Sequence, residues 1–354
     1  MKVFINGISS ISAQKSVQDN GIFSDTISYS ENILPTVNPV YKDYISPGAA
    51  RRMAKGVKMG TVVSKIALQE AKISNPDAII TGTGMGCTQD SEKFVRAIID
   101  NNEQFLTPTS FIQSTHNTVG AQIALGLQCN NYNFTYVNDA VSFESCLIDA
   151  QMMLSEGAEN VLVGGVDEHG QHTNELHKII GHIKSETIKN LNLFDTKTTG
   201  TIFGEGANFF VLSRNKSADS YATLIDTDIY NRLERSGLEM AVQQFMRKNG
   251  LTPDDIDIVI LGNNGDVEFD QNYQPLTNEL FKNTQQVVYK HLCGEYNTAS
   301  AYGFYLAVNI LKRQEIPKVC RFNTIDSNKY QNVLLYNQYR GKNHSLVLLQ
   351  HANF

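Results

Sequence analysis

The stretch NPDAIITGTGMG, residues 75–86, recurs in its pattern of residue types as DIDIVILGNNGD, residues 255–266. Asp77 and Asp257 then correspond, 180 residues apart. Further along, the stretches HNTVGAQIALGL and YNTASAYGFYLA align at the same separation. Periods of about 20–50 residues indicate solenoids or propellers. A separation of this length indicates instead two copies of a whole lobe.

Each copy shows the alternation of helix, strand and helix that is typical of an α/β fold. A helix leads through a polar turn to a β-branched strand, the strand ends in glycines, and a helix of small residues follows. This order predicts a mostly parallel sheet covered by helices in each half, and two such halves stack as an αβαβα sandwich. The polar run Arg214–Asp219 marks the seam, which predicts one half at 1–215 and the other at 216–354. Helices are expected at Met53–Ala71, Val119–Leu127, Gly237–Lys248 and Ala299–Leu311.

The composition excludes several classes of function. Hydrophobic residues make up 41% and charged residues 19% of the 354 positions, as in an ordinary globular protein. The net charge of −6 argues against a nucleic-acid binder, and no apolar run reaches the roughly 20 residues of a membrane span. The start, MKVFINGISSI, predicts a first strand rather than a signal peptide. Five scattered cysteines without a CxxC pair favour free thiols in a reducing cytoplasm.

The segment FTYVNDAVSFESCLIDAQ, residues 134–151, contains the turn at which a nucleophile is expected. Phe134–Val137 predicts a buried strand and Ser142–Gln151 a helix. A thiol at such a helix N-terminus is activated, because the helix dipole stabilises the thiolate. The turn offers Val141 instead, and the nearest cysteine, Cys146, lies more than one helical turn further on.

Five motifs, in order, resemble those of the β-ketoacyl synthases of the thiolase superfamily, over most of the chain. The most specific is LFDTKTTGTIFGEGANFFVL, residues 193–212, which matches a pattern with Phe-Asp, a glycine and Gly-Glu-Gly-Ala before an apolar strand. The others are GTGMG at 82–86, VLVGGVDE at 161–168, LTPDDIDIVI at 251–260 and YKHLCGEYNTASAYG at 289–303. The resemblance implies a thiolase-like αβαβα sandwich of two duplicated halves with mostly parallel or mixed five-stranded sheets. It also implies decarboxylative condensation by one cysteine and two histidines, which need a low-pKa thiol and neutral imidazole donors.

All three chemical positions are changed in this chain. The nucleophile position falls on Val141, which cannot be acylated. The first histidine position, counted back from an aspartate, falls on Gly262, or on Asn263 with a shift of one residue. The second falls on Glu295, while the family's lysine is retained as Lys290. A disabled malonyl site and a misaligned surface turn are the two interpretations of Glu295.

The selective loss of these positions resembles chain-length factors, which are non-catalytic partners of an active ketosynthase. QSTHNTVGAQIALGLQ and VNDAVSFES are similar to ketosynthase-like proteins of aryl-polyene and flexirubin-type pathways. The resemblance implies acyl carrier protein as one partner, and an active ketosynthase (as a heterodimer) or a second copy of the chain as the other. It implies no metal, nucleotide or redox cofactor. The residues expected to line the acyl tunnel or pocket are Phe111, His116, Thr201, Phe203 and Tyr339.

Two other functions stay open. The chain could be an active acyltransferase with an atypical nucleophile, either Cys146 or Ser142, although a buried hydrophobe and a helix cap are the simpler interpretations. It could also be a homodimeric module that binds an acyl chain or carrier protein. His169, His172 and His177 do not form a metal motif, and a solvated loop and helix start is expected there.

Overall fold

The computed structural model describes residues 2–15, 23, 25–325 and 329–353. In this part of the chain ten strands form one mixed sheet in the order β3-β2-β4-β5-β1-β6-β10-β9-β7-β8. The first five strands along the chain make up one half of that order and the last five the other. The strands are β1 Val3–Ile11, β2 Ala78–Gly82, β3 Tyr132–Tyr136, β4 Asn160–Asp167, β5 Gly206–Ser213, β6 Ala222–Tyr230, β7 Ile258–Leu261, β8 Gln285–Val288, β9 Asn332–Tyr339 and β10 Lys342–His351.

The two halves have the same internal order, which extends the sequence repeat to the whole topology. In one half β2 pairs in parallel with β3 and β4, and β5 runs antiparallel between β4 and β1. In the other half β7 pairs in parallel with β8 and β9, and β10 runs antiparallel between β9 and β6. Antiparallel pairing of β1 with β6 joins the halves. We propose the predicted boundary between residues 215 and 216, which lies between β5 and β6, as the division.

The aspartates that revealed the repeat make equivalent hydrogen bonds. Asp77 Oδ2 accepts the backbone N–H groups of Glu159 and Asn160, which lead into β4. Asp257 Oδ2 accepts those of Gln331 and Asn332, which lead into β9. Each aspartate thus ties the start of one parallel strand to the start of its neighbour.

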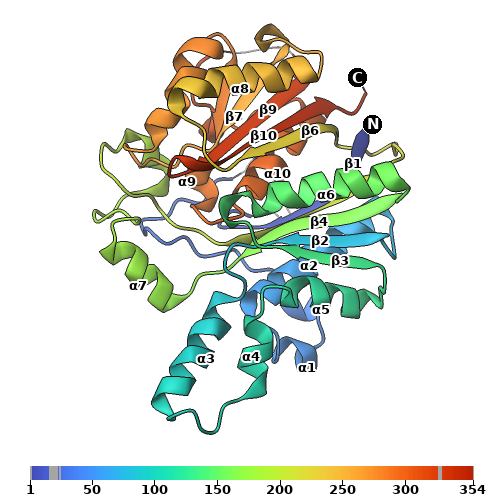
Figure 1. The fold of residues 1–354 in the computed structure, drawn as a ribbon, viewed down its shortest axis with the longest axis vertical. Helices are drawn as coiled ribbons and strands as arrows, with labels where there is room; N and C mark the ends of the chain where they lie inside the picture. The colour runs from blue at the N-terminus through green and yellow to red at the C-terminus, as the bar shows by residue number, and fades with distance from the viewer. Residues whose placement is uncertain (1, 16–22, 24, 326–328, 354) are drawn as a thin grey trace.

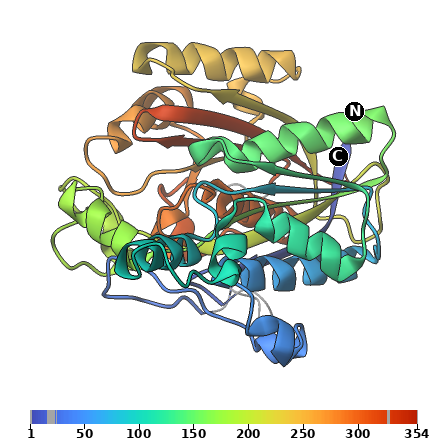
Figure 2. The same cartoon turned by 60° about the horizontal axis from the view of Figure 1, so that its bottom comes forward.

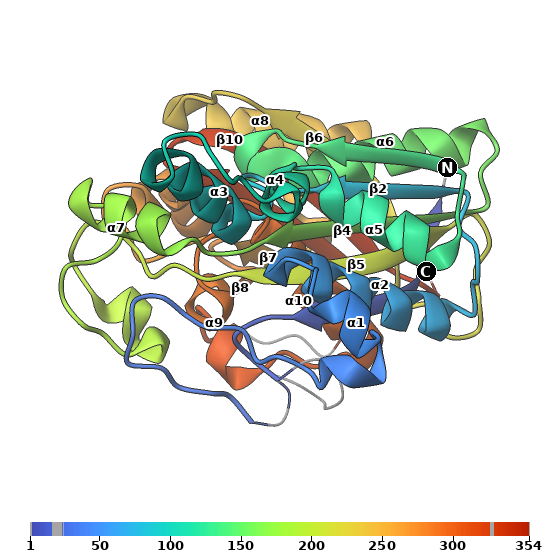
Figure 3. The ribbon, with the colours of Figure 1, turned by 90° about the horizontal axis from the view of Figure 1, so that it is seen from below.

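Helices cover the sheet in three layers. The helices are α1 Pro47–Ala50, α2 Lys55–Ala71, α3 Thr88–Asp100, α4 Pro108–Ser114, α5 Thr118–Leu127, α6 Ser142–Glu156, α7 Gln171–Ile179, α8 Arg235–Lys248, α9 Lys290–Cys293 and α10 Ser300–Arg313. Helices α6 and α10 lie between the two halves of the sheet and share one core with strands of both (Figure 1). Helices α2 and α5 cover the outer face of the first half, and α8 covers that of the second (Figure 2). Helix α3 lies beside α7 at one end (Figure 3).

The helices predicted from small and apolar residues agree with α2, α5, α8 and α10 to within two residues at each end. The prediction of a buried strand at Phe134–Val137 is wrong, because β3 is an edge strand of the sheet. Phe134 is 46% exposed and Val137 is 50% exposed. Within the described residues, none of the helices combines the length and apolar character that a bilayer span requires.

Candidate functional site

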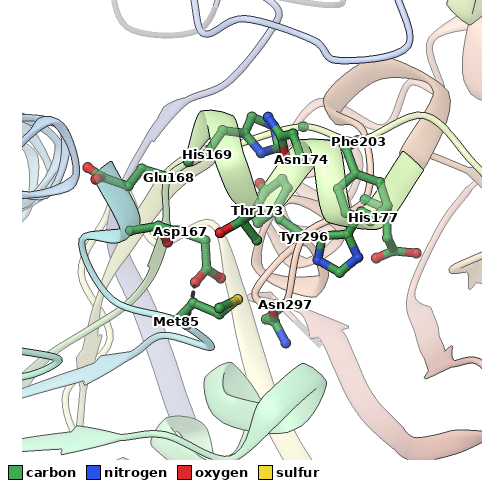
Figure 4. Close-up of a pocket in the computed structure, with 14 residues that line it drawn as sticks. Met85, Asp167, Glu168, His169, Thr173, Asn174, His177, Phe203, Tyr296 and Asn297 are labelled. Carbon is green, nitrogen blue, oxygen red and sulfur yellow. Dashed lines mark hydrogen bonds between the residues drawn. The ribbon is translucent and has the colours of Figure 1, made fainter. Parts of the chain in front are cut away.

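A hollow of about 400 Å³ lies where β2, β3 and β9 end, and a narrower pocket adjoins it beside α7. Ligands of open α/β sheets bind outside the carboxyl ends of the parallel strands, so this is the expected place for a site. In Figure 4, Asp167 and Glu168 lie on one side of the adjoining pocket, and His177, Phe203, Tyr296 and Asn297 lie on the other. The main hollow is lined by Gly84, Met85, Asp139, His177, His182, Phe203, Glu295, Tyr296, Asn297 and Tyr339.

The turn between β3 and α6 presents Asp139, and not Val141, to this hollow. Asp139 has a left-handed φ of +50°, and its carboxylate accepts hydrogen bonds from Asn297 Nδ2 and, at 2.7 Å, from Asn343 Nδ2. Val141 is only 4% exposed and faces the interior. The sequence register and the spatial arrangement therefore point to different residues at the tip of the turn.

The two atypical nucleophiles considered from the sequence lie outside the hollow. Cys146 is fully buried, its thiol donates to the carbonyl of Ser142 at 3.1 Å, and burial raises its pKa well above the usual value. Ser142 Oγ donates to the carbonyl of Asp139 at 2.7 Å and accepts the N–H of Asn138 at 2.9 Å. The expected helix cap is wrong in detail, because Ser142 bonds to the preceding turn and caps no N–H group of α6.

Glu295 is buried beside the hollow, which excludes the interpretation as a surface turn. Its Oε2 lies 2.7 Å from Lys290 Nζ, and the two side chains are 3% and 1% exposed. The same oxygen accepts Asn264 Nδ2 at 2.7 Å. Lys290 begins α9, five residues before Glu295, so the short helix and the turn at Gly294 bring the charges together. Lys290 thus forms a buried ion pair.

Neither residue expected at the first histidine position reaches Glu295. Gly262 faces away, because a Cβ atom there would lie 2.1 Å from Asn337 Oδ1. Asn263 is buried, and it is Asn264 that contacts Glu295. Glu295 therefore lines the hollow while Lys290 and Asn264 hold its carboxylate from behind.

The expected tunnel residues fall into two groups. Phe203 and Tyr339 line the hollow. Thr201 is buried behind it, where its hydroxyl donates to the carbonyl of Asn264. Phe111, on α4, and His116, just after α4, are exposed and lie outside the described hollow.

The expectation of solvated histidines holds for His172 and is wrong for its two neighbours. His169 and His177 line the pocket beside α7. Burial lowers the pKa of His169 to about 4, which keeps its ring neutral. His177 Nδ1 lies 3.1 Å from Nδ1 of His182, a residue that sequence reasoning missed. Within the described ranges no group of three or more histidine, cysteine, aspartate or glutamate residues could hold a metal ion.

Two buried acids at the end of β4 fix the walls of the pocket. Asp167 accepts the N–H of Gly84 and both the N–H and the hydroxyl of Thr298, each at 2.8 Å, so it ties the loop after β2 to the start of α10. Glu168 accepts the N–H groups of Gly56 and Gln89, at the starts of α2 and α3. Burial raises the pKa of Glu168 to about 7. The motif VLVGGVDE contained both acids, but a motif alone does not say which groups they hold.

Known proteins resemble this chain in sequence and in fold. A sequence model of the β-ketoacyl synthase N-terminal domain matches residues 39–218, whereas no curated protein matches the chain. The ishigamide ketosynthase/chain length factor superposes with a TM-score of 0.81 at 15% identity, over 99% of this chain and 98% of that chain. A β-ketoacyl synthase from Burkholderia phymatum STM815 superposes with a TM-score of 0.80 at 15% identity, over 99% of each chain.

A third solved structure is that of AntDE:AntF, a type II PKS acyl-carrier protein in complex with its ketosynthase. It superposes with a TM-score of 0.74 at 16% identity, again over 99% of each chain. At these identities the likeness shows the fold alone. The thiolase-like αβαβα sandwich predicted from the sequence is confirmed.

Proposed function

This chain belongs to the β-ketoacyl synthase family, and from that premise we propose that it is a non-condensing subunit of the chain-length-factor type. It would act in fatty acid or polyketide biosynthesis, and the motif likeness favours a polyene pigment pathway of the aryl-polyene or flexirubin type. The observation that supports the proposal is the polar lining of the hollow, where, among the described residues, Asp139 and Glu295 lie and no cysteine does. In sequence register the nucleophile position is Val141, and in space we assign it to Asp139.

The polar groups of the hollow do not suit condensation. Decarboxylation of a malonyl unit needs neutral donors aimed at the developing oxyanion. Glu295 is instead an acceptor whose charge is paired with Lys290, so it offers no donor to an oxyanion. Asp139 could in principle form an anhydride, but both of its oxygens already accept amide hydrogen bonds.

The hollow suits a chain that is bound without reaction. Phe203 and Tyr339 supply apolar walls, and ligand pockets combine such walls with a few placed polar groups. We propose that these two residues bound the acyl tunnel, with Thr201 supporting the loop behind Phe203. Phe111 and His116, exposed near α4, are then candidates for contact with a partner's tunnel.

The β3 edge favours a partner with a sheet edge of its own. Unpaired edge strands pair readily with other strands, and this one carries exposed aromatic rings. Tyr132 and Phe134 stack with their centroids 6.1 Å apart, and Phe134 lies 4.9 Å from Tyr136. We propose that an active ketosynthase pairs here, with acyl carrier protein delivering the chain, and a second copy of this chain is the alternative occupant.

Intact-mass spectrometry tests the absence of chemistry directly. The purified chain is incubated with octanoyl-carrier protein, with and without a ketosynthase of the same pathway. Its intact mass is measured, and peptide mapping then locates any acyl group. The proposal expects a complex with the ketosynthase and no acyl adduct on this chain. A stoichiometric adduct on Asp139, Cys146 or Ser142 would instead make it an acyltransferase with an atypical nucleophile. A stable homodimer that does not bind the ketosynthase and takes no acyl adduct would identify the chain as a binding module.

A further inference from the structure

Two histidines that have no part in the condensing positions meet inside the hollow. His177 lies in the last turn of α7, and His182 follows the turn at Gly181, which has a φ of +74°. The N–H of His182 donates to the carbonyl of His177 at 2.9 Å, and the N–H of Thr201 donates to the carbonyl of His182 at 2.9 Å. These bonds hold the two main-chain positions together, and the ring centroids lie 5.2 Å apart.

The hydrogen bond between the rings fixes their proton arrangement. Because the contact joins Nδ1 to Nδ1 at 3.1 Å, one ring must donate an Nδ1–H and the other must accept with a bare Nδ1. In a neutral pair the donor ring then has a bare Nε2 and the acceptor ring an Nε2–H. The pair therefore carries one base, the bare Nε2, and one acid of the same chemical type, the Nε2–H.

The surroundings favour the neutral form of both rings. Burial and the nearby Arg340 guanidinium lower the pKa of both His177 and His182, while Asp266 opposes this at His182. Asp139 and Glu295 are the other charged groups that line the hollow, and each is held by partners of its own. Phe203, whose ring centroid is 4.8 Å from that of His177, closes the apolar side.

We propose that His177 and His182 form an acid–base site that removes water from a 3-hydroxyacyl thioester bound in the hollow. Elimination needs a base at C2 and an acid at the C3 oxygen in the same step, and histidine is the side chain that most often fills these roles in general acid–base catalysis. The inference rests on the proposed function in one respect, namely that the hollow binds an acyl chain.

The step balances without any further reactant. The bare Nε2 takes a proton from C2 while the Nε2–H of the other ring protonates the C3 hydroxyl. The C2–H and C3–O bonds break, a C2–C3 double bond forms, and water leaves. In the same step the Nδ1–H moves across the hydrogen bond to the ring that gives up its Nε2 proton, so neither ring becomes an imidazolate. Both rings end neutral with their roles exchanged.

A small thioester tests the inference without any partner protein. The purified chain is incubated with 3-hydroxyoctanoyl-pantetheine in D₂O, and the 2-enoyl product and deuterium at C2 are measured by mass spectrometry. We expect product from the wild type and from His172→Ala, an exposed histidine of the same helix that serves as control. His177→Gln and His182→Gln should each lose about 100-fold or more of the rate.

The outcomes separate this inference from the proposed function. No enoyl product and no C2 deuterium with the wild type, or equal rates in the glutamine variants, would overturn the acid–base site even if the ketosynthase still binds. Enoyl product from a chain that binds no ketosynthase would support the acid–base site and contradict the proposed ketosynthase partner. Nitrogen-15 spectra of the wild type test the tautomers without any substitution. If both rings carried the proton on Nε2, the Nδ1–Nδ1 hydrogen bond could not exist.

Discussion

The buried pair of Glu295 and Lys290 makes a residue-scale prediction about stability. Removing one member of a buried ion pair leaves a charge without compensation, which costs about 3–5 kcal/mol. We expect Glu295→Gln to lower the free energy of unfolding by this order, and Glu295→Leu with Lys290→Met to recover most of the loss. Urea denaturation measures the free energy of unfolding of each variant. The exposed pair of Lys72 and Asp219, 3.9 Å apart, is the control, because surface pairs contribute about 1 kcal/mol or less.

Glu168 makes a second residue-scale prediction, on pH. Its pKa rises from 4.5 to about 7 in the folded chain, so between these values the folded state keeps a proton that the unfolded state loses. The free energy of unfolding therefore falls as pH rises through this window, by on the order of 3 kcal/mol. Glu168→Gln should gain stability relative to the wild type between pH 5 and pH 8. Urea midpoints at both pH values test this, with the exposed Glu175→Gln as control. A difference between Glu168→Gln and the wild type that is the same at pH 5 and pH 8 would contradict the prediction.

At the scale of elements, strand β3 should decide association. Phe134→Lys places a charge among the exposed rings of this edge, and charged residues are how natural sheets block edge pairing. We expect the variant to stay folded and to lose association with the ketosynthase or with itself. Sedimentation velocity measures this, and Met240→Lys, on the exposed face of α8, is the control. Unchanged association of Phe134→Lys would show that another surface holds the partner.

The elements also show what the sequence could predict and what it could not. Periodicity and small residues located α2, α5, α8 and α10, because those signals are local. Whether Asp139 or Val141 faces the hollow depends on one positive φ, which no composition reveals. His182 was missed because only the turn at Gly181 brings it back to His177. The edge position of β3 depends on which strands pair with it, and apolar residues alone do not distinguish an edge strand from a buried one.

At the scale of the whole molecule, duplication did not produce two independent bodies. Core residues of α6, such as Phe143 and Leu147, pack with residues of α10, such as Phe304, and with strands of both halves. Phe210 of β5 and Phe304 of α10 are in edge contact at 4.7 Å between centroids. The ladder from β1 to β6 then continues the sheet across the seam. Each half therefore lacks part of its own interior when alone.

This shared interior predicts that the chain unfolds as one unit. Residues 1–215 alone would expose the apolar face of α6, and residues 216–354 alone would expose that of α10, so neither should fold cooperatively. Calorimetry of the full chain should show a single transition, and far-UV circular dichroism of each half should show no cooperative melt. Mixing the two halves should restore the native signal, because each half supplies the apolar surface that covers the other. A sharp melt from either half by itself would mean that the middle layer is an interface between two domains rather than a common core.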